Sequence, residues 1–321
     1  MNGRIVLFAV AAGAMLMSWC ASFVLWRAAE RGEDVMPLAT RDFSALEVIT
    51  VGTGSAYENP ERRGPSVALG DGEVVWLVDA GRGVAEGLRA AAIPVSQPGT
   101  VFLTSLLPVN TVGLDDLLML GFRQGRTQPL RVIGPPGTQA FASALEQAYK
   151  EVADALAQQL ALSPEGARIE ALEVDGTFSE SIGGWTARAS VLQGGPTPAL
   201  VWGFEDAARK LVIAGSSWDP EEIIRFSKGA DLLVHEAVFI PTEEDAANAE
   251  LELDIAKLDR ERPLYVSIND IGAMAQKAAV GELALIRLRP PPLYNFRFKS
   301  IVARNYDGTV SLPEDGESIW P

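Results

Sequence analysis

The stretch Val101–Leu114 reads VFLTSLLPVNTVGL and passes from an apolar strand into a loop. The run of apolar residues at 101–103 predicts a short buried strand, and Thr104 ends it. Pro108 has no amide hydrogen and therefore excludes regular strand pairing in the loop. A loop that follows a buried strand is a common place for functional side chains. This loop instead carries residues with little chemistry: Ser105, Leu107, Val109 and Asn110.

Apolar runs and turn residues on both sides of this loop predict a mixed α/β domain. The runs at 66–72 and 74–80, separated by an Asp-Gly turn, indicate a β-hairpin. Helical spacing of apolar residues predicts helices at 84–93, 141–162, 221–229 and 268–280. Further strands are expected at 46–56, 130–134, 169–174, 185–192, 199–206, 210–215, 231–237 and 282–288. Hairpins precede strand–helix alternation, and this order occurs twice.

Composition limits the possible functions. The chain has 321 residues, of which 48% are hydrophobic and 21% charged, which suits one large domain or two small ones. The net charge of −15 argues against nucleic-acid binding, because basic surfaces supply most of that affinity. Cys20 and His235 are single representatives of their residue types, which excludes an intrachain disulfide and a cysteine-based zinc site.

The N-terminal stretch Ile5–Trp26 contains no charged residue. At about 1.5 Å per residue, a helix of this length covers the roughly 30 Å hydrocarbon core of a membrane. The following Arg27 and Arg31 are typical interfacial anchors. A cleaved signal peptide is the alternative, but no small-x-small cleavage site follows cleanly. We therefore expect an uncleaved transmembrane anchor with its flanks at 1–31, a linker at 32–43, and one domain at 44–321.

The positive charges on the two sides of this single-pass anchor are nearly balanced, because Arg27 and Arg31 follow it. Its short basic N-terminus decides the expected orientation. Arg4 and the terminal amine precede the apolar stretch, and such a start usually stays in the cytoplasm. The C-terminal domain has no cysteine, which an oxidising compartment tolerates. We expect the anchor in the inner membrane of the cell and the domain on its periplasmic, non-cytoplasmic side.

Several phrases in one order resemble the metallo-β-lactamase superfamily, specifically its ribonuclease Z-like and arylsulfatase-like branch. The phrases are VGTGSA (51–56), ERRGPS (61–66), LVDAGRGV (77–84), IGPPGT (133–138), PALVWGFE (198–205), VIAGSS (212–217) and LLVHEA (232–237). Asp79 matches the aspartate of the family's LxDxGxG turn. The resemblance covers about residues 46–315 and implies a four-layer αββα sandwich, with metal ions between the loops at one edge of its sheets.

The same resemblance implies that the metal ligands have been lost. In active members the loop at 104–110 reads T-H-x-H-x-D-H and carries zinc ligands. Here Thr104 is kept, whereas Ser105, Leu107, Val109 and Asn110 replace the ligands. The remaining ligand positions align with Gln193, Ser216 and Arg287. We expect no metal and no other cofactor.

Oxygen ligands and serine nucleophiles are the two possible replacements for the missing zinc ligands. Asp79, Asp115 and Asp116 could offer a hard cation an all-oxygen shell, but Leu107, Val109 and Arg287 would make the region apolar and partly cationic. His235 and Glu236 match the family's H-E-A-T phrase, and without an activated nucleophile we expect them to form a remnant hydrogen-bonded pair. A serine–histidine arrangement using Ser105, Ser216 or Ser217 is the alternative, but no G-x-S-x-G motif occurs.

These observations predict a pseudoenzyme rather than an enzyme. We expect a membrane-anchored, non-catalytic pseudo-hydrolase domain that serves as a structural or accessory subunit of a larger membrane complex, such as a photosynthetic or respiratory one. Its partners would be integral membrane proteins, contacted through small residues of the anchor, and would not include nucleic acid. Two alternatives stay open. One is a small-ligand module whose old cleft is lined by Arg287, Gln193, Asn110 and the serines; the other is a hydrolase with a metal-independent mechanism.

Overall fold

The computed structural model describes residues 15, 17–27, 36–56, 59, 61–182, 184–239, 241, 244, 254–289 and 295–320. The chain divides into two compact units, Met1–Ala39 and Thr40–Pro321. In the first unit, residues 17–27 are helical, and all of their side chains are exposed. No helix within the described residues is long and apolar enough to span a bilayer. Much of the predicted anchor Ile5–Trp26 lies outside the described residues.

The second unit contains two mixed sheets. The first sheet has the order β14-β1-β2-β3-β4-β5-β6. It is antiparallel from β14 to β3 and parallel from β3 to β6. Its strands are β1 (Phe43–Gly52), β2 (Ser66–Gly72), β3 (Val74–Val78), β4 (Pro98–Phe102), β5 (Leu130–Gly134), β6 (Ile169–Glu173) and β14 (Glu317–Trp320).

The second sheet repeats this plan in the order β13-β12-β11-β10-β9-β8-β7. Strands β7 to β10 are antiparallel, and β10 to β13 are parallel. Its strands are β7 (Phe178–Ile182), β8 (Trp185–Leu192), β9 (Ala199–Glu205), β10 (Lys210–Ala214), β11 (Leu232–Val238), β12 (Glu282–Arg289) and β13 (Thr309–Ser311). The predicted duplication, hairpins followed by strand–helix units, is therefore confirmed.

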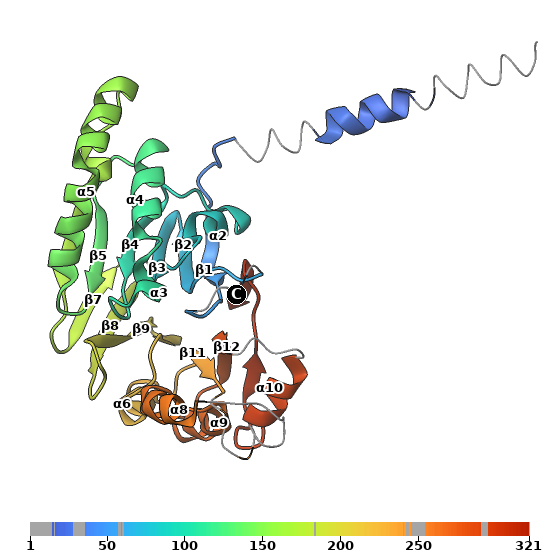
Figure 1. Ribbon diagram of the computed structural model, residues 1–321, viewed down its shortest axis with the longest axis vertical. Helices are drawn as coiled ribbons and strands as arrows, with labels where there is room; N and C mark the ends of the chain where they lie inside the picture. Colours follow the sequence, from blue (N-terminus) through green and yellow to red (C-terminus); the bar gives the residue numbers. More distant parts are fainter. Residues whose placement is uncertain are drawn as a thin grey trace, which may run out of the picture. The chain divides into compact units, whose positions relative to one another are not determined.

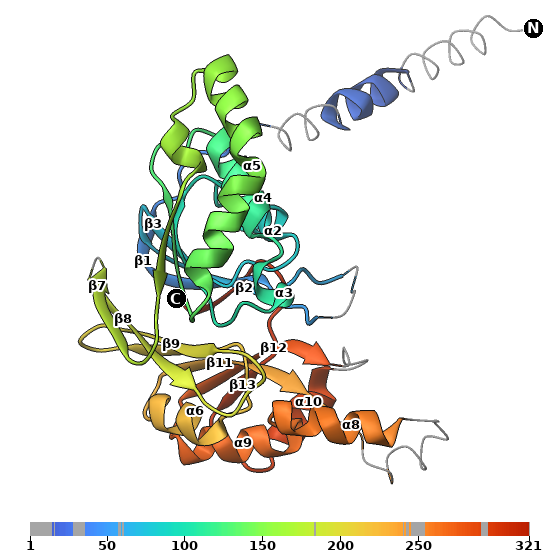
Figure 2. The same ribbon diagram turned by 60° about the vertical axis from the view of Figure 1, so that its left-hand side comes forward.

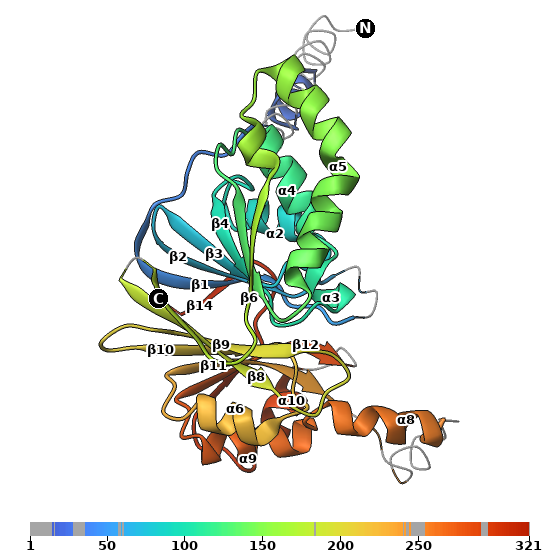
Figure 3. The same cartoon turned by 90° about the vertical axis from the view of Figure 1, so that its left-hand side faces the viewer.

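Helices cover the outer face of each sheet, which produces four layers (Figures 1, 2 and 3). The first sheet carries α2 (Val84–Ala90), α3 (Pro108–Thr111), α4 (Leu114–Arg123), α5 (Thr138–Leu160) and the 3-10 turn η1 (Pro164–Ala167). The second carries α6 (Pro220–Phe226), α8 (Ile255–Glu261), the 3-10 turn η2 (Arg262–Leu264), α9 (Ile268–Lys277) and α10 (Asn295–Val302). The predicted αββα sandwich is present.

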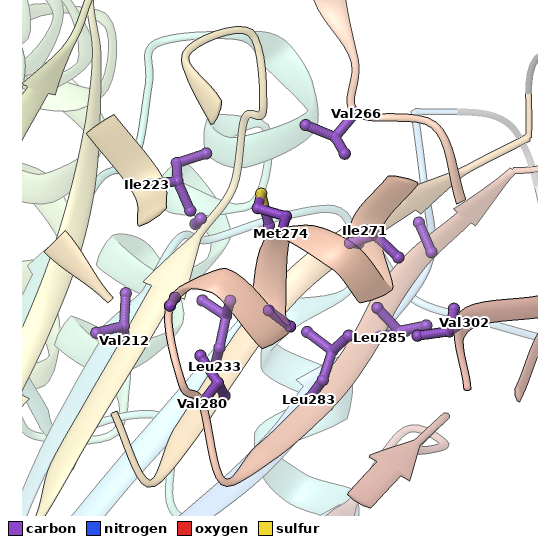
Figure 4. Packing of buried hydrophobic residues seen from close by; sticks show 14 of the residues in the cluster. Val212, Ile223, Leu233, Val266, Ile271, Met274, Val280, Leu283, Leu285 and Val302 are labelled. Carbon is purple, nitrogen blue, oxygen red and sulfur yellow. The ribbon is translucent and has the colours of Figure 1, made fainter. Parts of the chain in front are cut away.

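Apolar side chains fill the three spaces between these layers. Helix α9 begins at its cap Ser267, whose hydroxyl accepts a hydrogen bond from the amide of Asn269. Its buried face then sets Ile271 and Met274 over the second sheet (Figure 4). Between the two sheets lies an aromatic core that contains Trp76, Phe102, Trp202 and Phe204. This packing brings the loops at the carboxyl ends of the parallel strands to one edge of the sandwich.

Candidate functional site

A cavity of about 580 Å³ lies at this edge, where loops from both sheets meet. The carboxyl ends of parallel strands are the usual ligand side of an α/β sheet. The cavity is lined from the first sheet by Ser55, Ala56, Gly64, Arg82, Leu107, Pro108, Val109 and Val112. From the second sheet it is lined by Pro196, Gly215, Ser216, Trp218, Glu236, Val238, Leu264, Tyr265, Arg287 and Arg289.

Asp79 is the centre of a buried polar network at this edge. It follows β3 in the left-handed conformation, with φ of 62°. Its Oδ1 accepts a hydrogen bond of 2.8 Å from the amide of Thr104, and its Oδ2 accepts one of 2.8 Å from the Thr104 hydroxyl. Burial raises the pKa of Asp79, while Arg287 and the two Thr104 hydrogen bonds oppose that rise. Thr104 therefore holds the carboxylate.

Arg287 reaches this carboxylate from the opposite sheet. Its Nη2 donates to Asp79 Oδ2 at 2.6 Å, and its Nη1 donates to Asn110 Oδ1 at 2.8 Å. Only 6% of Arg287 is exposed, and its φ of 54° is left-handed, which costs energy for a non-glycine residue. Gly215 leaves room for this arrangement, because a Cβ at that position would clash with the side chains of both Thr104 and Arg287. The ion pair thus links β12 to the loops after β3 and β4.

Asn110 and Ser105 complete the network from below the cavity. The Asn110 amide nitrogen donates to Ser105 Oγ at 2.8 Å and to Thr104 Oγ1 at 3.0 Å. Both residues are fully buried. They support Arg287 instead of facing a ligand.

Glu236 lies on the cavity wall and is held by a second set of hydrogen bonds. The Ser217 hydroxyl donates to Glu236 Oε1 at 2.6 Å and accepts a hydrogen bond from the amide of Val266 at 2.9 Å. Burial raises the pKa of Glu236, and Arg287 opposes this effect. The Ser217 hydroxyl thus already donates to Glu236 and accepts from Val266.

His235 is fully buried beside Glu236 but does not pair with its carboxyl group. Its Nδ1 lies 2.6 Å from the backbone carbonyl oxygen of Glu236, and since a carbonyl only accepts, Nδ1 carries the hydrogen. Nε2 has no hydrogen-bond partner among the described residues. Burial lowers the pKa of His235 to about 4, so the ring is neutral at pH 7. The hydrogen bond between His235 and Glu236 therefore involves a backbone carbonyl and not the carboxyl group, and no serine hydroxyl of the described residues bonds to the ring.

Several predicted positions lie away from the cavity wall. Gln193 is exposed, and its backbone amide donates to Asp219. Asp115 accepts a hydrogen bond from the Tyr149 hydroxyl, 2.8 Å away on α5, and Asp116 lies beside it on α4. The prediction that Gln193, Asn110 and Ser105 line the cleft was wrong, because the first is on the surface and the other two are beneath it. Leu107, Val109, Ser216 and Arg287 do line it.

Sequence reasoning missed the aromatic part of the wall. Trp218 follows the AGSS phrase directly, and Tyr265 lies just after η2. An aromatic residue placed just after a strand that ends at the cavity edge was the available signal for Trp218. No comparable signal marks Tyr265, which a long connection brings to the cavity.

Solved structures with this arrangement identify the architecture. The metallo-β-lactamase fold protein YhfI from Bacillus subtilis superposes with a TM-score of 0.66 at 17% identity, over 86% of this chain and 99% of that one. The chain has the metallo-β-lactamase fold. The short form of human tRNase Z is similar over 85% of this chain and 98% of its own, with a TM-score of 0.60 and 20% identity.

Sequence comparison points to ribonuclease Z-like relatives within this metallo-β-lactamase fold. Ribonuclease Z of Mycobacterium bovis (strain BCG / Pasteur 1173P2) is 27% identical over 279 residues, which cover 84% of this chain and 96% of that protein. Ribonuclease Z of Mycobacterium sp. (strain KMS) is 29% identical over 279 residues, which cover 84% and 94%. No protein-family model matches the chain.

The residues at this edge do not fit the metal centre that the metallo-β-lactamase fold implies. Leu107 and Val109 carry no donor atom, and the Asp79 carboxylate is bonded to a buried guanidinium. A divalent cation beside Asp79 would meet the positive charge of Arg287 at close range. Within the part of the chain that the structure describes, no three histidine, cysteine or acidic side chains form a group suited to a metal ion.

Proposed function

We propose that this chain is a non-catalytic, membrane-tethered pseudo-hydrolase that serves as a structural or accessory subunit of a larger membrane complex. The ion pair between Arg287 and Asp79 carries the proposal. A guanidinium 2.6 Å from the carboxylate supplies the positive charge that a metal ion would supply in an active relative. Metal binding at Asp79 would break this pair and leave the Arg287 guanidinium buried without its counter-charge, which is costly.

The state of His235 also supports the absence of catalysis. A general base works best when its pKa lies near the working pH, and burial lowers that of His235 to about 4. Its Nδ1 is engaged with the Glu236 carbonyl, and no serine hydroxyl among the described residues meets its Nε2. Neither of its nitrogens is thus joined to a nucleophile.

Membrane attachment is proposed from the N-terminal segment. The stretch Ile5–Trp26 is uncharged, and within it the described side chains of Trp19, Phe23 and Trp26 are all more than half exposed. Exposed apolar and aromatic side chains on one helix need a lipid or protein environment. We place the folded unit on the periplasmic side and the partners among integral membrane proteins.

Hydrolysis of RNA is the main rival function, because several relatives are named ribonuclease Z. A nucleic-acid substrate needs a basic surface to offset its phosphates, whereas this chain carries a net charge of −15. A metal-independent hydrolase would need an activated nucleophile, which the serines near His235 do not provide.

Hydrolase assays on the full chain in mild detergent test the proposal. Precursor tRNA, a phosphodiester, a sulfate ester and a β-lactam should all stay at background rates with added zinc, manganese or iron. A ribonuclease Z assayed in parallel provides the positive control. Turnover that a chelator or His235→Ala abolishes would refute the proposal.

Membership of a complex is tested separately by fractionating detergent-solubilised membranes by size. The chain should migrate with larger species and retain integral membrane proteins after affinity capture. A matched control replaces residues 1–31 with an unrelated single-pass anchor, which should keep the chain in the membrane but release these partners. Migration of the native chain as a free monomer would contradict the proposed role.

A further inference from the structure

The cavity above the buried network has mainly apolar walls. Leu107, Val109 and Val112 line one side, and Trp218 and Tyr265 lie on the side contributed by the second sheet. Its volume of about 580 Å³ is within the range of roughly 300–1,000 Å³ that encloses small organic ligands. The substitutions that remove metal-ligand chemistry at positions 107 and 109 are the same ones that make this wall apolar.

Two of the three arginines of the described wall, Arg287 and Arg289, are in ion pairs within the protein. Arg287 is bonded to Asp79, and Arg289 donates to Glu261 at 2.7 Å while its guanidinium stacks 4.7 Å from the centre of the Tyr265 ring. Arg82, at the exposed rim, donates to the backbone carbonyls at positions 59 and 62. A phosphate or carboxylate group would therefore have to compete with Asp79 for Arg287 and with Glu261 for Arg289.

The aromatic wall is fixed in place before any ligand arrives. Gly195 lies so close to the Trp218 indole that a Cβ there would overlap the ring. Glu236 is likewise held by Ser217. A cavity with such pre-set walls loses little conformational entropy when it is filled.

We infer that this cavity binds a neutral, mainly apolar organic molecule that offers one hydrogen-bonding oxygen to the Glu236 and Ser216 end of the wall. The inference rests on the proposed loss of metal chemistry at the same edge. Apolar walls favour a ligand whose apolar surface leaves water. An anionic ligand would lose its hydration, and behind the rim it would meet only guanidinium groups that already have carboxylate partners. The expected ligand class therefore differs from phosphate esters in charge.

Fluorine NMR of the full chain, labelled with 5-fluorotryptophan in a mild detergent, tests this inference. Trp218 reports on the cavity, and Trp202, buried between the sheets with its indole bonded to the Leu103 carbonyl, is the internal control. Trp218→Phe and Trp202→Phe assign the two signals. The probes are 2-naphthol and 2-naphthyl phosphate, which share one ring system and differ in charge.

We expect 2-naphthol to shift the Trp218 signal in a saturable way without moving that of Trp202, and 2-naphthyl phosphate to require at least about tenfold higher concentration. Val109→Asp, which places a carboxylate on the wall, should weaken the binding of 2-naphthol at least about tenfold. The matched change Val152→Asp on the exposed face of α5 should leave binding unchanged.

Several results would overturn the inference. One is binding of 2-naphthyl phosphate that is as tight as, or tighter than, that of 2-naphthol. Another is binding of 2-naphthol that Val109→Asp does not weaken. The third is the lack of any saturable shift of the Trp218 signal, as expected if only a partner protein fills the cavity. Hydrolytic turnover would instead overturn the proposed function and is measured separately, so the two failures are distinguishable.

Discussion

The two sheets of this molecule are joined by two kinds of contact. In the middle of the interface, Phe102 packs edge-on against Trp202 and Phe204, with ring centres 4.8 and 5.1 Å apart. At the edge, one ion pair between Arg287 and Asp79 and its surrounding hydrogen bonds replace apolar packing. The first contact excludes water without directional demands, whereas the second requires particular atoms in particular places.

The difference shows how such an edge can remain intact without metal ions. Metal ions at this edge would bind residues from both sheets, and their loss alone would leave Asp79 as a buried, unpaired carboxylate. Arg287 provides a permanent positive charge from the second sheet, and Thr104 and Asn110 complete its hydrogen bonds. We expect the aromatic core to supply most of the interface stability and the ion pair to fix the geometry of the edge.

The largest loss of stability is expected from the aromatic region. Phe102→Ala should lower the free energy of unfolding by about 4 kcal/mol, because it opens a cavity in a closely packed core. Denaturant unfolding of the full chain in mild detergent, followed by tryptophan fluorescence, measures this. The control Val152→Ala, at an exposed helix position, should change the value by less than about 0.5 kcal/mol. Equal effects of the two substitutions would show that the aromatic core has been assigned wrongly.

Removal of the ion pair at the edge should destabilise the chain slightly less than Phe102→Ala does. Arg287→Met should lower the free energy of unfolding by about 3 kcal/mol, because the Asp79 carboxylate is left buried without a counter-charge. Asp79→Asn removes that charge and should recover part of the loss. A double-mutant cycle with these two substitutions should give a coupling of about 2 kcal/mol. Additive effects would mean that the two side chains do not depend on each other.

A smaller and pH-dependent effect is expected from His235. Its folded pKa of about 4 lies below the ordinary 6.5, so the unfolded chain binds the extra proton between these values. The contribution of His235 to stability is therefore complete above pH 6.5 and falls as the pH drops toward 4. At pH 5 the loss should be about 2 kcal/mol relative to pH 7.

The matched variant His235→Asn isolates this group from the acidic residues that also titrate in this range. The difference in unfolding free energy between the native chain and this variant should change with pH in the stated direction. A difference that stays constant from pH 7 to pH 5 would show that His235 is not buried in its neutral form.

Much of the fold was predictable because its central strands are continuous apolar runs. Strands β9 to β12 are buried on both faces and therefore stand out in the sequence. Strand β7 was missed because only two of its five residues, FSESI, are apolar. Strand β14 was missed because it is short and follows a polar turn.

The lack of donor atoms at positions 107 and 109 was visible in the sequence, but the ion pair between Asp79 and Arg287 was not. Asp79 and Arg287 are 208 positions apart, and nothing in the local sequence indicates that Arg287 adopts a left-handed backbone and turns toward the first sheet. Gln193 was assigned to the site from the order of phrases alone. The structure exposes Gln193, and the segment after β8 contributes Pro196 to the cavity wall instead.

The metal content of the full chain, purified from cells grown with added zinc, manganese and iron, tests the central claim most directly. We expect far less than one equivalent of any of these metals per chain. The Asp79 carboxylate is already paired with Arg287, and the side chains of Leu107 and Val109 offer no donor atoms. Arg287→Met serves as a comparison and should not acquire stoichiometric metal, since the other ligands are still missing. One or two tightly bound metal ions per native chain, lost together with Asp79 in Asp79→Asn, would contradict the account.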